Sequence, residues 1–320
     1  MNWPILILSI LLVGAIAFGR DILAWLKRRR DEPARRARIA AYNAGFVAEN
    51  PDTTPFTDAE IAEAMAWRAT LALPAVILEP ATGAAVGAAG TRIGGPVWLG
   101  EGEAWPADAE GRPLEFVAQV DFAELPPLPD FPTEGLVQLF VGRDDLFGMS
   151  FDAPDKGAAR ALWRPAPLEG GRLTPSPPLK DDYAVHGRDT ESTPFDSREI
   201  RDAGLPLRGR PATLAPSPGD WRYFARMEGQ WRREGAPDFD ERLEGEDDAG
   251  GVCHVGGHPA FTQYDFREPG RLEDYDRTLL RLTSAHGLVW GDVGEANFLI
   301  RREDLLARRF DRVIFWWDCT

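Results

Sequence analysis

The frequency of proline and glycine constrains the fold of this chain more than any other feature of its sequence. The chain contains 27 prolines and 32 glycines, and both residues interrupt regular helices. The stretch RPAPLEGGRLTPSPPL (164–179) is too rich in both to form one regular element. This composition favours a turn-rich domain that contains strands over a helical bundle.

Several short segments have the pattern of strands. LEFVAQVDF (114–122) alternates apolar and polar residues with the two-residue period of a half-buried strand. GLVQLFV (135–141) and PAVILEP (74–80) are two further predicted strands. TDAE (57–60) is a capping box, in which a threonine hydroxyl and a glutamate carboxylate satisfy free amides at a helix start. It predicts a helix that runs to about Leu73.

Further helices are predicted at 31–50, 220–235 and 302–310. The last lies between predicted strands at 296–300 and 312–317. Strands and helices do not alternate along the chain as they do in a doubly wound sheet. We therefore expect the α+β class, with a compact domain around a mixed or antiparallel β-sheet.

The N-terminus contains an apolar run, WPILILSILLVGAIAFG (3–19), that carries no charge. As a helix, these residues span about 25 Å, slightly less than the ~30 Å hydrocarbon core of a bilayer. The apolar run resumes after Arg20 and Asp21 with ILAWL. The pattern predicts one transmembrane helix within residues 1–26.

The flanks of this segment predict its orientation. The arginine-rich stretch follows the apolar run, and the positive-inside rule keeps such a flank in the cytoplasm. We expect a single-pass anchor in the inner membrane, N-terminus out, with a cytoplasmic C-terminal domain; the alternative is an exported protein with a cleaved signal peptide. The predicted membrane-interface residues are Trp3, Trp25, Lys27, Arg28, Arg29 and Arg30.

These features predict three regions. Residues 1–26 form the anchor, 27–55 a basic helical stalk and linker, and 56–320 the α+β domain. A proline- and glycine-rich insertion interrupts the domain near 164–215.

Charge is unevenly distributed along the chain. The net charge is −15, yet residues 1–50 hold eight Lys/Arg against four Asp/Glu, a balance of +4, so the remainder carries −19. An acidic domain repels nucleic-acid phosphates, which argues against nucleic-acid binding. The two cysteines, Cys253 and Cys319, do not make a disulfide framework and fit a reducing compartment.

WGDVGEANFLI (290–300) has the spacing of a phosphotransferase catalytic loop, with Asp292, Asn297 and a later Asp318. The context excludes that chemistry, because lysine is nearly absent and no helical lobe follows Asp318. We interpret the segment as a tight turn between two strands, in which Asp292 and Asn297 bind turn amides.

Other polar residues allow two interpretations. CHVGGH (253–258) brings a cysteine and two histidines together, but the spacing matches no common zinc pattern. No catalytic, cofactor-binding or metal-binding residue is assigned from the sequence, and no cofactor is expected. The residues that remain candidates for a polar cluster are Asp292, Asn297, His258, Gln263 and Asp265.

Six blocks occur in an order that resembles a known family: IGGPVWLGEGEAWP, GRPLEFVAQVDFAELP, GLVQLFVGRDDLFG, GGHPAFTQYDFR, LVWGDVGEANFLI and FDRVIFWWDC. Together they resemble the YwqG-like family, a bacterial domain family of unknown function, over roughly residues 60–320. The resemblance implies a compact α+β domain around a substantial β-sheet, with no established reaction or agreed catalytic residues. Relatives considered in toxin–immunity settings imply a binding module.

We expect a protein-binding module of an immunity-like kind rather than an enzyme, whose partner is another protein near the membrane. The alternative is a hydrolase with a polar pocket around Asp292, His258 and Asp265. An enzyme should bring at least two of these side chains into one open cleft. A binding module should bury or scatter them and expose an apolar or aromatic patch.

Overall fold

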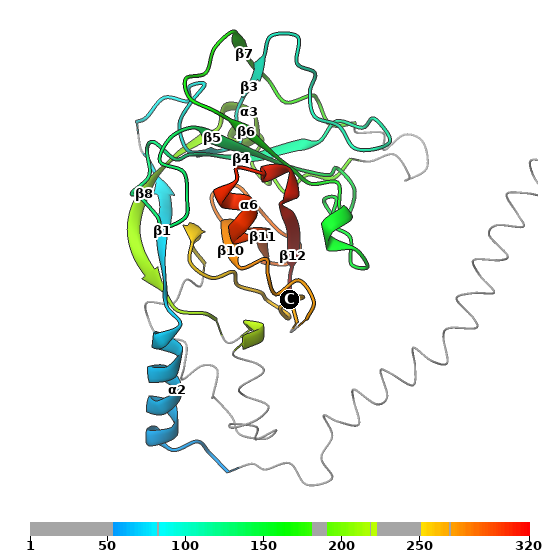
Figure 1. Cartoon of the computed structure of the whole chain (residues 1–320). Coiled ribbons are helices and arrows are strands. Elements are labelled where there is room, and N and C mark those ends of the chain that lie inside the picture. Colours follow the sequence, from blue (N-terminus) through cyan, green and yellow to red (C-terminus); the bar gives the residue numbers. More distant parts are fainter. Residues whose placement is uncertain (1–53, 82, 181–190, 218, 223–250, 269) are drawn as a thin grey trace, which may run out of the picture. The chain divides into compact units, whose positions relative to one another are not determined.

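The computed structural model of the 320-residue chain describes residues 54–320 except 82, 181–190, 218, 223–250 and 269 (Figure 1). All of the assigned helices and strands belong to the larger of two compact units, which comprises residues 57–231 and 238–320. This unit is dominated by antiparallel β-sheet.

A ten-stranded sheet forms the body of this unit, and a two-stranded sheet pairs β3 with β7. The order of the large sheet is β12-β11-β10-β9-β1-β8-β2-β4-β5-β6, and every neighbouring pair is antiparallel. The strands are β1 (Leu73–Pro80), β2 (Arg92–Ile93), β3 (Val97–Gly100), β4 (Glu115–Asp121), β5 (Leu136–Val141), β6 (Arg160–Arg164), β7 (Gly171–Thr174), β8 (Leu205–Leu214), β9 (Cys253–Gly256), β10 (Arg277–Thr283), β11 (Glu295–Ile300) and β12 (Ile314–Asp318).

The two ends of the large sheet pack against each other, so that the sheet is curled (Figure 1). Apolar side chains from β4 and β5 share one core with those from β10, β11 and β12. Near the edge of the sheet, Trp163 of β6 stacks on Phe310 with ring centroids 4.9 Å apart. Phe122 contacts both of these rings. The core therefore lies inside the curl, between its two halves.

Strand β5 illustrates how the sheet uses its two faces. Val137, Leu139 and Val141 enter the shared core, whereas Phe140 belongs to a separate apolar cluster. The β3–β7 pair supplies Val97 and Leu99 to that second cluster. Both faces of β5 are thus covered, which explains why all six of its residues are buried.

Helices are few among the described residues. α2 (Asp58–Thr70) begins at Thr57 with the predicted capping box: the Thr57 hydroxyl accepts from the Glu60 amide, and the Glu60 carboxylate accepts from the Thr57 amide. The others are α3 (Arg198–Ala203), α6 (Arg302–Leu306) and two short 3₁₀ segments, η1 (Pro154–Lys156) and η3 (Phe310–Arg312).

The predicted α+β class is wrong, because the described residues form mostly one large curled antiparallel sheet with few helices. The predicted helix at 302–310 ends at Leu306, and only a short 3₁₀ turn, η3, follows before β12. The helix predicted at 31–50, and most of the one predicted at 220–235, lie outside the described residues. The strand predictions near 74–80, 114–122 and 135–141 are confirmed by β1, β4 and β5.

The predicted transmembrane helix is not supported. Within the part of the chain that the structure describes, no helix has the length and apolar character needed to cross a bilayer. Residues 1–26, on which that prediction falls, lie outside the described residues, as do Trp3, Trp25 and Lys27 to Arg30.

The turn before β11 yields a prediction about stability. A Cβ at Gly294 would lie 1.9 Å from the Asp318 carbonyl oxygen and 2.7 Å from that of Trp290. Gly294→Ala should therefore lower the free energy of unfolding by about 3 kcal/mol, because backbone atoms must move apart. Gly87→Ala is the control, since its nearest neighbour would be 3.6 Å away. Equal urea midpoints for the two variants would show that the turn tolerates a side chain.

Candidate functional site

Two members of the predicted polar cluster, His258 and Asp265, come together in a buried ionic network. Arg267 binds Asp265 through two bonds, from Nη2 to Oδ2 at 2.6 Å and from Nε to Oδ1 at 2.9 Å. Arg222 donates from Nη2 to Asp220 Oδ2 at 2.7 Å and to His258 Nδ1 at 2.8 Å. Arg267 Nη2 also lies 3.3 Å from Asp220 Oδ2. This contact joins the Arg267–Asp265 pair to the group that Arg222 forms with Asp220 and His258.

His258 is held as a neutral ring with both nitrogens engaged. Its Nε2 lies 2.7 Å from the Leu71 carbonyl oxygen, which only accepts, so Nε2 carries the proton and Nδ1 accepts from Arg222. Burial, reinforced by the Arg222 charge, lowers the pKa of His258 to about 4. No lone pair of this ring is left to act as a general base.

The carboxylates of the network are also fully engaged. Burial raises the pKa of Asp265, and the Arg267 bonds oppose that rise. Burial acts in the same direction on Asp220, but the bonds from Arg222 hold its pKa below the ordinary value. Two arginines thus balance two aspartates around a neutral histidine, an arrangement that holds the loop after β9 in place.

Gln263 lies apart from this network, at the end of β12. Its backbone amide donates to Asp318 Oδ2 at 2.8 Å, and its Nε2 donates to the Cys319 carbonyl oxygen at 2.6 Å. Asp318 also accepts from the Thr262 amide at 3.1 Å. Asp318 is therefore an acceptor for a turn and not a metal ligand of phosphotransferase type.

Asn297 and Asp292 are separated from each other. Asn297 is buried on β11, and its Nδ2 donates to the Ala260 carbonyl oxygen at 2.8 Å. Asp292 is exposed in the turn before β11, and its carboxylate accepts no hydrogen bond from the described residues. The expectation that both side chains bind turn amides is wrong, and the five candidates do not share one open cleft.

The cysteine and histidine of β9 lie in the interior. Cys253 is fully buried, and burial raises the pKa of its thiol to about 11. Burial lowers the pKa of His254 to about 3, and its Nδ1 donates to the Gly256 carbonyl oxygen at 2.9 Å. Among the described residues, no three His, Cys, Asp or Glu side chains are grouped to hold a metal ion.

Four exposed apolar side chains border strand β12, and we call them the β12 surface: Leu146, Phe151, Tyr264 and Val293. Phe151 and Tyr264 are 54% and 56% exposed, and both rings contact Trp316 of β12, with centroids 5.6 and 6.4 Å away. The other two border the same strand: the Leu146 carbonyl oxygen accepts from Trp317 Nε1, and Val293 precedes Gly294, which packs on Asp318.

Carboxylates accompany this surface. Asp145, Asp152 and Asp292 are exposed and are the sequence neighbours of Leu146, Phe151 and Val293. The surface therefore combines apolar contact area with negative charge.

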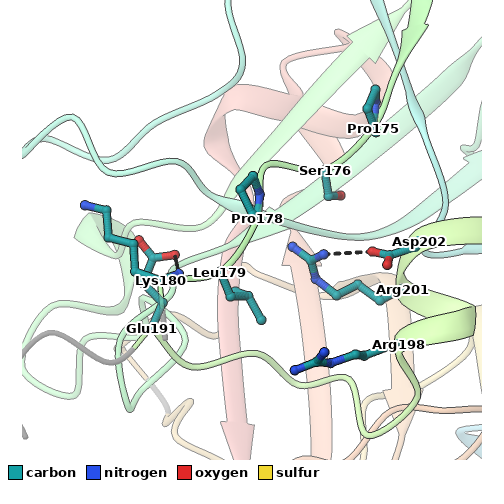
Figure 2. A pocket seen from close by; sticks show the side chains of 9 residues that line it. All are labelled: Pro175, Ser176, Pro178, Leu179, Lys180, Glu191, Arg198, Arg201 and Asp202. Carbon is teal, nitrogen blue, oxygen red and sulfur yellow. Dashed lines mark hydrogen bonds and ion pairs between the residues drawn. The ribbon is translucent and has the colours of Figure 1, made fainter. Parts of the chain in front are cut away.

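A second feature is a pocket of about 560 Å³ between α3 and the segment that follows β7 (Figure 2). Its rear wall is built on Glu115, the fully buried first residue of β4. Arg201 binds this carboxylate at 2.5 and 3.2 Å, and Arg143 binds it at 2.7 Å. The same guanidiniums donate to the Pro177 carbonyl oxygen at 2.8 and 2.9 Å.

This arrangement follows from the chemistry of proline. Residues 175–178 have the sequence PSPP, and prolines have no amide hydrogen with which to continue the β-ladder of β7. The carbonyl oxygens still need donors, and the arginine forks supply them while Glu115 balances the charge. Arg143 is further paired with Glu191 at 3.0 Å.

Sequence reasoning missed this network. A glutamate inside the apolar strand LEFVAQV is a signal for a buried ion pair, because an unpaired carboxylate is rarely buried. Nothing local identifies its partners, since Arg201 is 86 residues away along the chain.

The network predicts a large effect of neutralising its central carboxylate. Glu115→Gln leaves two buried guanidiniums with less negative charge, so the free energy of unfolding should fall by about 3–5 kcal/mol. Glu79→Gln is the control, because Glu79 binds Arg208 and Arg210 at the surface; its urea midpoint should barely change. Equal urea midpoints for Glu115→Gln and Glu79→Gln would show that the Glu115 carboxylate does not stabilise the buried arginines.

The buried histidines predict a dependence of stability on pH. The pKa of His258 lies near 4 in the folded protein and its ordinary value is 6.5, so the unfolded chain binds more protons between these pH values. The free energy of unfolding should therefore fall as pH falls from 6.5 to 4, by up to about 1.4 kcal/mol per pH unit from this group. His254 acts in the same direction.

His258→Gln isolates this contribution, because glutamine can both donate to Leu71 and accept from Arg222. Urea unfolding at several pH values should show a smaller slope for this variant than for the wild type. His286→Gln, at a partly exposed turn, is the histidine control. An unchanged slope in His258→Gln would mean that His258 is not held neutral.

Comparison with known proteins locates the chain in a family. No curated protein matches it. A family model described as a domain of unknown function, DUF1963, matches residues 91–319 and so includes β2 to β12, the β12 surface and the pocket. The chain belongs to the DUF1963 family.

Proposed function

We propose that this domain is a protein-binding module that uses the β12 surface to hold a segment rich in lysine, arginine and apolar residues. The observation that carries the proposal is that two half-exposed rings, Phe151 and Tyr264, each contact the same buried ring, Trp316. Aromatic side chains that contribute little to the core, yet lie together at the surface, are typical of contact sites.

The charge of the protein supports a basic partner. The net charge is −15, and exposed aspartates accompany three of the four side chains of the β12 surface. A negative field speeds the approach of a basic segment, and aromatic faces attract lysine and arginine side chains. Within DUF1963, we further assign the chain to YwqG-like proteins on the ordered motifs at 93–106 and 288–300.

The hydrolase alternative gains no support from the geometry. His258 and Asp265 are buried and bound on all sides, and Asp292 lies apart from them at the surface. A binding module is the simpler account of a domain in which His258 and Asp265 are engaged in its own structure.

Site-specific photo-crosslinking in cells that express the full chain tests the proposal. A photoreactive phenylalanine analogue at position 151 or 264 should cross-link the same protein, and mass spectrometry should place the link in a lysine- or arginine-rich segment. The control is position 173, since Leu173 is 40% exposed but lies on β7. The yield should fall as salt is added before irradiation. Equal cross-linking at position 173, or a link to an acidic segment, would overturn the proposal.

A further inference from the structure

We propose that the pocket in Figure 2 binds a small organic monocarboxylate that carries an apolar body. None of the residues that line this pocket belongs to the β12 surface, and the inference does not depend on the proposed protein partner. Its volume of about 560 Å³ lies within the range of small-molecule sites.

The rear wall of the pocket is rigid. Arg201 lines the pocket while its guanidinium is fixed by Glu115, Asp202 and the Pro177 carbonyl oxygen. Arg143 and Glu115 stand behind it, with side chains 1% and 0% exposed. A ligand that enters therefore meets a positive group that needs no rearrangement, which reduces the entropy lost on binding.

Arg198 is the cation available to a ligand. Its guanidinium makes no ion pair or hydrogen bond with the described residues, although it lines the pocket. Figure 2 shows Arg198 and Arg201 extending from the same helix toward the segment that carries Pro178 and Leu179. The Lys180 ammonium points away from both arginines in this view. A planar guanidinium matches the two oxygens of a carboxylate, which makes Arg198 the expected anchor.

The opposite wall is apolar with one polar atom. Pro178 and Leu179 supply hydrocarbon surface beside the arginines, and Pro175 lines the pocket farther along the same segment. Ser176 Oγ is buried and has no hydrogen-bond partner among the described residues. The pocket thus pairs an anion anchor with an apolar wall.

The charges favour a single carboxylate over a phosphate. Glu191 and Asp202 also line the pocket, so a dianion would experience more repulsion there than a monoanion. The protein as a whole carries a net charge of −15, which further disfavours the binding of highly charged anions.

Calorimetric titration of the full chain with phenylacetate and with phenylacetamide tests the assignment, because the two probes share shape and differ in charge. Phenylacetate should bind more tightly, and Arg198→Gln should weaken it roughly tenfold while leaving the amide unaffected. Arg198→Lys should recover part of the lost affinity, because lysine restores the positive charge but lacks the planar set of donors that a guanidinium presents. Lys180→Gln should have less effect than Arg198→Gln.

Arg208→Gln is the matched control, an arginine with a 71% exposed side chain that pairs with Glu79; it should bind phenylacetate as the wild type does. Thermal melting of each variant confirms that it is folded, and Arg198 is exposed enough for that to be expected. Equal affinity for the two probes, or unchanged phenylacetate binding in Arg198→Gln, overturns the proposal. Stronger competition by inorganic phosphate than by acetate also overturns it.

Discussion

The rest of the structure depends on the hydrophobic contact between the two halves of the ten-stranded sheet. Side chains from β4 and β5 share a single core with those from β10, β11 and β12. A sheet that curls in this way removes apolar surface from water on its inner face, and the stacked rings of Trp163 and Phe310 lie where the halves meet. Because the halves are brought together, loops from distant parts of the sequence surround β12.

Two buried ionic networks hold the irregular segments around this sheet. One joins Glu115 to Arg143 and Arg201 and holds the proline-rich segment after β7. The other joins Arg222 and Arg267 to two aspartates and His258 and holds the loop after β9. Segments that cannot join a β-ladder need other donors, and the guanidinium fork supplies several at once. Lysine supplies no such fork, and the sequence after residue 31 contains only Lys156 and Lys180.

The same use of charge engages most of the candidate acids and bases in the fold itself. His254 and His258 are neutral, both ring nitrogens of His258 are engaged, and the carboxylates nearest to His258 balance arginines. Two features of the described residues are open to solvent: an aromatic surface beside aspartates, and a pocket lined by Arg198, which has no ion pair or hydrogen bond with the described residues. The first suits a basic segment of a protein, and the second suits a small carboxylate.

Much of the strand content was predictable from the sequence, and the candidate site was not. Alternation in 114–122 and the apolar run in 135–141 identified β4 and β5, and TDAE identified the start of α2. The α+β class failed because the helical pattern at 302–310 yields only a short helix before β12. Of the polar candidates, His258 and Asp265 do lie together, but as parts of a buried network that their local sequence does not reveal.

The sequence by itself determined where strands occur, where α2 begins and that the domain is acidic, because periodicity, capping and charge are local properties. The tertiary structure alone decided that β1 pairs with β8 and β9, and that Glu115 meets Arg201 across 86 residues. Strand partners and ion partners depend on which distant surfaces the curled sheet brings into contact. That choice is made by the packing of the whole core, and no short stretch of residues contains it.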